Sequence, residues 1–156
     1  MGVKILICTD GSQALIEGIK CVIGALRKDN KFMLLYVLSE HGLYHSYKSI
    51  FKEDLEKIEE LFGETDSEKE AAKELFLSPL FDYMKNSGFN VRKKVREGQV
   101  TEEILNEIIE GDYGLVILGD KTGLSPARLL LGSTVSEVMH RANICVVVIK
   151  PTDLLK

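Results

Sequence analysis

The sequence predicts an α/β fold in which helices cover both faces of a single five-stranded parallel sheet. Two observations support this prediction. Five short apolar segments are spaced along the chain, and four of them are nearly continuous in Val, Ile and Leu, as is typical of strands buried on both faces. Segments with helical periodicity separate them, so strand and helix alternate. This alternation implies right-handed βαβ units and a three-layer, doubly wound arrangement.

The predicted strands differ in polarity. The third contains the run Arg92-Lys93-Lys94, and a strand this polar is expected near an edge of the sheet. The other four are apolar enough for helices to cover both of their faces. The five predicted segments are Val3–Cys8, Phe32–Leu38, Val91–Val95, Leu115–Leu118 and Ile144–Ile149.

Helices are predicted between the strands from their apolar periodicity and their terminal residues. The first carries an apolar face from Leu15 to Leu26. A later helix has Thr101 as its expected N-cap and Gly111 where a C-cap glycine belongs. The last helix is expected to use Ser133 or Thr134 as its cap.

The segment between the second and third strands is predicted to hold two helical stretches, Ile50–Phe62 and Ser67–Asn86. Glu and Lys are frequent from Lys52 to Glu74, which is typical of a solvated helix face. Pro79 is expected to break or kink the second stretch.

Composition restricts the possible functions. The net charge is −4 and the pI is about 5.5, which argues against a nucleic-acid partner. The longest apolar run, Ile144–Ile149, is too short to span a membrane. The three cysteines form no Cys-x-x-Cys pair and fit a reducing cytoplasm. With no repeat and no linker-like segment, residues 1–156 are predicted to form a single domain.

The candidate binding site lies beyond the carboxyl ends of the strands, where open parallel sheets bind ligands. A strand ends at Leu118-Gly119, and a helix begins at Gly132-Ser133-Thr134. Free backbone N–H groups and the positive end of the helix dipole would favour an anion there. A simple helix cap is the alternative interpretation. The P-loop and Rossmann glycine patterns are absent, and no catalytic residue set or metal site is evident.

The same segment resembles the motif G-x2-G-x9-G-S/T of nucleotide-binding universal stress proteins, through Gly119 and Gly132-Ser133. Asp10-Gly11-Ser12 after the first strand and Asn143–Lys150 at the last strand are also similar to that family. The resemblance covers nearly the whole chain, with residues 41–87 the least diagnostic. It implies a Rossmann-like fold of the adenine nucleotide alpha hydrolase type, with strand order 3-2-1-4-5.

The resemblance also implies roles for individual residues. Asp10 would hydrogen-bond the sugar or base of an adenine nucleotide, and Val37 would meet the adenine through its backbone. Leu118 and Gly119 would line the approach to ribose and phosphate. The phosphates would be held by Gly132, Ser133 and Thr134.

One position departs from the family pattern. The second motif glycine is replaced by Thr122, and a glycine follows one residue later at Gly123. Thr resists a positive φ, so the loop either passes through Gly123 or partly blocks the pocket.

Three functions follow from the resemblance. The first is a regulatory module that binds ATP, ADP or AMP, with Mg²⁺ or Mn²⁺ on the phosphates. The others are a slow ATPase and a structural adaptor that binds no nucleotide. A homodimer formed through the edge strand Ile144–Ile149 is implied as well.

Overall fold

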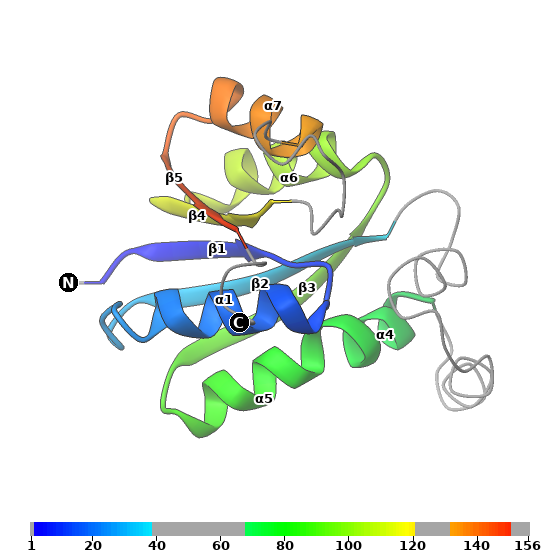
Figure 1. The fold of residues 1–156 in the computed structure, drawn as a ribbon. Helices are drawn as coiled ribbons and strands as arrows, with labels where there is room; N and C mark the ends of the chain where they lie inside the picture. The colour runs from blue at the N-terminus through cyan, green and yellow to red at the C-terminus, as the bar shows by residue number, and fades with distance from the viewer. Residues whose placement is uncertain (1, 39–67, 121–131, 151–156) are drawn as a thin grey trace.

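The computed structural model describes residues 2–38, 68–120 and 132–150. In these residues five parallel strands form one sheet in the order β3-β2-β1-β4-β5 (Figure 1). The predicted fold class and strand order are therefore confirmed, and the polar strand β3 lies at an edge. The strands are β1 (Lys4–Cys8), β2 (Lys31–Leu38), β3 (Asn90–Glu97), β4 (Leu115–Gly119) and β5 (Cys145–Ile149).

Helices cover both faces of the sheet, so the domain has three layers (Figure 1). One face carries α1 (Gln13–Ile23), α4 (Glu68–Ala72), the π-helical turn η1 (Lys73–Leu77) and α5 (Ser78–Asn86). The other face carries α6 (Val100–Gly111) and α7 (Ser133–Arg141). Among the helices that the structure describes, none is long and apolar enough to cross a membrane.

The central strand β1 shows why the strands are continuously apolar. Successive side chains of a strand point to opposite faces. Ile5 and Ile7 therefore join the core beneath α1 and α5, whereas Leu6 and Cys8 join the core beneath α6 and α7. Burial raises the pKa of the Cys8 thiol, with a smaller contribution from the negative charge of Glu107. Cys8 therefore serves as a small apolar side chain of the core.

The predicted break at Pro79 is not present, because the helical segment continues from α4 through η1 into α5. Proline has no N–H, and its ring clashes with the carbonyl four residues earlier, which here belongs to Leu75. The chain responds by widening into the π-helical turn η1, in which the backbone N–H of Ser78 bonds to the carbonyl of Lys73. The predicted helix over 50–62 lies outside the described residues.

The predicted ends of α6 are wrong by one or two residues. Its N-cap is Gln99, whose side-chain oxygen accepts a hydrogen bond from the N–H of Glu102 at 2.8 Å. Thr101 lies inside the helix. At the other end Gly111 is the last helical residue, and Asp112 adopts the left-handed conformation with φ 56°. Asp is among the few residues other than glycine that tolerate this conformation.

The predicted cap of α7 is also wrong. The N-cap is Gly132, and Ser133 and Thr134 are the first helical residues. No side chain of the N-cap residue can close the first turn, because the residue is glycine. The start of α7 therefore keeps backbone N–H groups that its own cap does not satisfy.

Candidate functional site

The candidate site lies where the strand order reverses. In the order β3-β2-β1-β4-β5 this switch falls between β1 and β4, whose last paired residues are Cys8 and Leu118. Asp10 and Asp120 each follow this pair by two residues, so both loops leave the sheet at the same level. The structure therefore brings the Asp10 loop and the Gly119 loop to neighbouring positions at the carboxyl edge.

The turn after β1 is held by side-chain to backbone bonds. The Asp10 Oδ1 atom accepts a hydrogen bond from the N–H of Ser12 at 2.8 Å, and Thr9 Oγ1 accepts one from Gly11 at 3.1 Å. Gly11 has φ 79°, and a Cβ atom there would lie 2.9 Å from the Cα of Phe76. Glycine is thus required both by the backbone conformation and by the close approach of η1.

The Ser12 hydroxyl adds a polar group with unused capacity. Its Oγ atom is buried and has no hydrogen-bond partner in the described part of the chain. Ser12 is also the N-cap position of α1, yet its side chain makes no capping bond. A buried polar atom without a hydrogen-bond partner is uncommon in folded proteins. The Ser12 hydroxyl is therefore a candidate for a hydrogen bond with a ligand.

Two residues assigned to the ligand also serve the core. Leu118 is 2% exposed and its side chain belongs to the core beneath α6 and α7, so this side chain is not available to a ligand. A Cβ atom at Gly119 would lie 2.3 Å from the Leu15 side chain. Glycine at position 119 therefore lets α1 pack against the end of β4. Val37 of β2 is 9% exposed and lies opposite Arg96 of β3 in the sheet.

The start of α7 faces the end of β4, but one of its amides is already engaged. The N–H of Gly132 donates to the Asp120 Oδ1 atom at 3.0 Å. The first backbone bond of the helix runs from Ser136 N–H to the Gly132 carbonyl at 2.9 Å. The amides of residues 133–135 thus have no partner within the helix.

The two hydroxyl groups at this helix start differ in their environment. Thr134 Oγ1 accepts a hydrogen bond from Thr101 Oγ1 at 3.1 Å, which joins α7 to α6. Ser133 is exposed. Thr122 and Gly123, which were also assigned to the site, lie outside the described residues.

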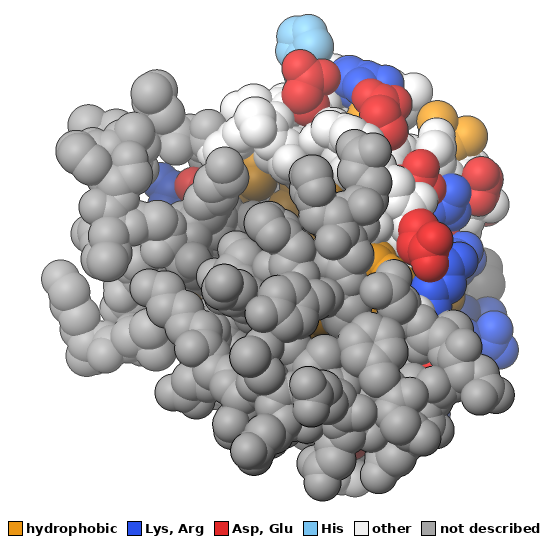
Figure 2. All heavy atoms as spheres, turned by 90° about the vertical axis from the view of Figure 1, so that its right-hand side faces the viewer, with side chains coloured by type: hydrophobic (Ala, Val, Ile, Leu, Met, Phe, Trp, Pro, Cys, Tyr) orange, Lys and Arg blue, Asp and Glu red, His pale blue; other side chains and the backbone are white. Residues whose placement is uncertain are grey.

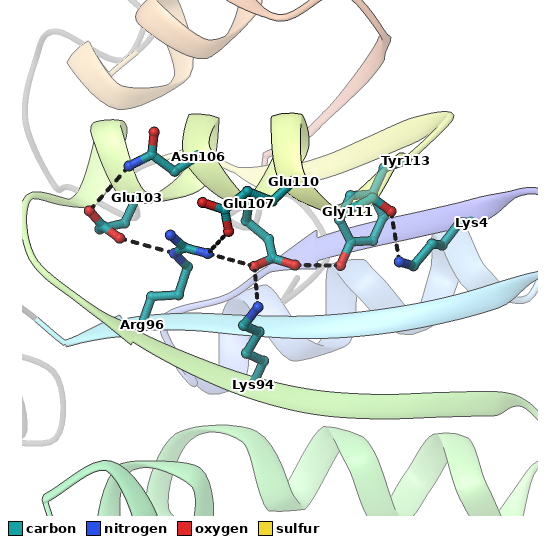
Figure 3. A network of polar contacts seen from close by, with 9 residues as sticks. All are labelled: Lys4, Lys94, Arg96, Glu103, Asn106, Glu107, Glu110, Gly111 and Tyr113. Atoms are coloured by element: carbon teal, nitrogen blue, oxygen red, sulfur yellow. Dashed lines mark hydrogen bonds and ion pairs between the residues drawn. The ribbon is translucent and has the colours of Figure 1, made fainter.

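A buried ionic network holds α6 against β3 (Figure 3). The Glu107 carboxylate is 3% exposed and contacts Lys94 at 2.7 Å, Arg96 at 3.0 Å and the Tyr113 hydroxyl at 2.7 Å. Burial opposes ionisation of Glu107, but hydrogen bonds from these three groups outweigh it and lower its pKa below the ordinary value. Burial and the bond to Glu107 raise the pKa of Tyr113.

This network fixes the loop between β3 and α6. Arg96, near the end of β3, also contacts Glu103 and Glu110 at 3.0 Å each. Two residues further, the N–H of Gly98 donates to the Leu38 carbonyl at 3.0 Å. The start of the loop is therefore bound to α6 through Arg96 and to β2 through Gly98.

Glu107 and Asp120 were not predicted from the sequence as residues with a special role. Glu107 stands among the buried residues of an apolar helix face, opposite a strand rich in Lys and Arg, and this combination could have indicated an ion pair. Asp120 follows a buried strand directly, at the position where ligand-site side chains are common.

Figure 2 views the end of the molecule where the strands terminate. On the described part of this face, acidic and basic side chains are interspersed along one edge. Within the described residues, no group of three or more His, Cys, Asp or Glu side chains is placed to hold a metal ion.

The sheet order and the polar loops at its switch point define a Rossmann-like α/β domain. The family model described as "Universal stress protein family" matches residues 1–150, and this chain belongs to that family. No curated protein matches it at a significant level.

Solved structures share the fold. The hypothetical protein MJ0577 is 24% identical, with a TM-score of 0.66 and coverage of 96% of both chains. A universal stress protein family protein from Arabidopsis thaliana, solved with AMP bound, is 14% identical, with a TM-score of 0.63 and coverage of 99% of both chains. A universal stress protein in complex with cAMP is 14% identical, with a TM-score of 0.62, and the match covers 96% of this chain and 98% of that chain.

Proposed function

We propose that this chain is a cytoplasmic regulatory module that binds an adenine nucleotide and acts as a homodimer. One observation carries the proposal: the start of α7 at Gly132-Ser133 faces the end of β4 beside the Asp10 turn. This arrangement occurs in a family that includes structures solved with AMP and with cAMP.

The chemistry of the described residues supports an anionic ligand. The amides of residues 133–135 and the positive end of the α7 dipole would stabilise a phosphate. The hydroxyl of Ser12, which has no hydrogen-bond partner among the described residues, would hydrogen-bond the nucleoside. Asp10 and the backbone of Val37 would contact the sugar and the adenine, and Thr122 and Gly123 would complete the loop. The candidate ligands are ATP, ADP and AMP, with Mg²⁺ or Mn²⁺ bound through the phosphates when it is present.

Binding is tested with nucleotide released from freshly purified protein, identified by mass spectrometry, and by calorimetric titration with AMP, ADP and ATP. Gly132→Val should abolish binding. It should leave the fold intact, because Gly132 has φ −60° and ψ 157°, a conformation that valine adopts. Gly114→Val is the control, since Gly114 is exposed and precedes β4 at the opposite end of the strand. Unchanged affinity in Gly132→Val would refute the assigned site.

The exposed edge of β5 supports the homodimer. In the described residues β5 pairs only with β4, and its side chains Val146, Val147 and Val148 are each partly exposed. An apolar edge strand of this kind favours pairing with another chain.

The dimer is tested by sedimentation of two cysteine variants. Cys145→Lys places a charge at the exposed start of β5 and should shift the protein toward monomer. Cys21→Lys makes the same change at an exposed position of α1 and should leave the association unchanged. A wild-type protein that sediments only as monomer would contradict the proposal.

A second candidate function is an adaptor that binds no nucleotide. The bond from Gly132 N–H to Asp120 favours it, because a carboxylate of the protein itself then neutralises the helix start. Absence of any released nucleotide, together with no heat of binding for the three nucleotides, would decide for the adaptor.

A further inference from the structure

We propose that Asp120 sets the charge preference of the nucleotide site, so that a nucleoside monophosphate binds more tightly than a triphosphate in the absence of divalent cations. The inference rests on the proposed nucleotide-binding function and identifies the ligand class of the same site. The observation behind it is that the Asp120 carboxylate holds the Gly132 amide, a group that a phosphate oxygen would use.

The backbone fixes Asp120 in this position. Asp120 directly follows the last residue of β4, and its N–H donates to the Ile149 carbonyl of β5 at 2.8 Å. The residue is only partly exposed, and its side chain reaches across the chain to the N-cap of α7. The carboxylate is therefore held at the helix start and is not a mobile surface group.

A carboxylate at this place has two electrostatic effects. It is stabilised by the positive end of α7 and by the charge-assisted bond from Gly132. A phosphate group entering the same helix start must either displace this carboxylate or remain close to it. Like charges at such short separation repel, and the repulsion increases with the number of negative charges that the ligand carries.

Sequence spacing alone would not indicate this competition. The motif positions Gly119 and Gly132 identify the helix start, but twelve intervening residues separate them. Folding places Asp120, the first of these residues, against Gly132. The side chain thus supplies an internal anion at the helix start where the proposed function places a phosphate.

The test is calorimetric titration in the presence of EDTA, with adenosine, AMP and ATP as ligands. Asp120→Asn keeps an oxygen that can accept the Gly132 bond and removes the charge. We expect it to tighten ATP binding by at least about tenfold, to tighten AMP binding by no more than about threefold and to leave adenosine unchanged. Asp112→Asn is the matched control, because it removes one charge from an exposed residue at the other end of β4 and retains a residue that tolerates positive φ.

The possible outcomes separate this inference from the function on which it rests. A gain that grows from adenosine to AMP to ATP in Asp120→Asn, and is absent in Asp112→Asn, would support the inference. Equal changes for the three ligands, or no change, would overturn it while nucleotide binding stands. If wild-type protein and both variants bound none of the three ligands, the proposed function would be refuted and the inference with it.

Discussion

Replacing the buried Glu107 by Gln should destabilise the domain in a pH-dependent manner. The carboxylate accepts from Lys94, Arg96 and Tyr113 at distances of 2.7–3.0 Å and is 3% exposed. Breaking a buried ion pair costs about 3–5 kcal/mol. The cost here should be smaller, about 2–3 kcal/mol, because the Lys94 side chain is 43% exposed and Arg96 keeps two other carboxylate partners.

The pH dependence follows from the direction of the pKa shift. The pKa of Glu107 is lower in the folded protein than its ordinary value of 4.5. Its ionised form therefore contributes stability above pH 4.5, and this contribution is lost as the pH falls through the folded-state pKa. The difference between wild type and Glu107→Gln should be full at neutral pH and should shrink on acidification below 4.5.

Urea unfolding followed by circular dichroism measures this difference at neutral pH and at the lowest pH where both proteins stay folded. Glu110→Gln is the control, because Glu110 contacts the same Arg96 but its side chain is 62% exposed. It should cost no more than about 1 kcal/mol. If Glu107→Gln cost no more than Glu110→Gln, or if its cost did not vary with pH, the assignment of a buried charge network would be wrong.

Two further substitutions test the turn after β1 and the contact between α6 and α7. Gly11→Ala should lower the free energy of unfolding by about 1–3 kcal/mol, because φ 79° is strained for alanine and its Cβ would meet Phe76; thermal unfolding measures this, and an unchanged melting temperature would contradict it. Arg141→Ala removes an exposed ion pair with Glu102 at 2.6 Å and should cost no more than about 1 kcal/mol in urea unfolding; a larger loss would show that the two helices depend on this pair.

The strands of the sheet were predictable because each is encoded by a pattern of neighbouring residues in the sequence. Each strand is a short apolar run, and alternation with helices leaves few topologies. The polarity of β3 indicated its edge position, which the structure confirms. The order of the strands came from family resemblance, since apolar runs do not show which strands are neighbours.

The helix ends were less predictable because they depend on tertiary contacts. Thr101 is a good N-cap by residue type, yet its hydroxyl bonds to Thr134 of α7, and Gln99 caps α6. Glu107 was missed for the same reason, since its partners come from β3 and from the residues before β4. Helix propensity and capping preference depend on a residue and its neighbours along the chain. The positions of these residues are instead determined by contacts with segments distant in the sequence.

The start of α7 shows how one contact can belong to both stability and binding. In the free protein the Asp120 carboxylate accepts a hydrogen bond from the backbone N–H of Gly132, the N-cap residue of α7. It thereby takes the role that a Glu or Gln at the third helical position plays in a capping box. A ligand phosphate at the same helix start would either displace this bond or bind the amides of residues 133–135 with the carboxylate close by. Under the proposed function, the charge at position 120 would therefore influence which ligands bind at the site between residues 119 and 132.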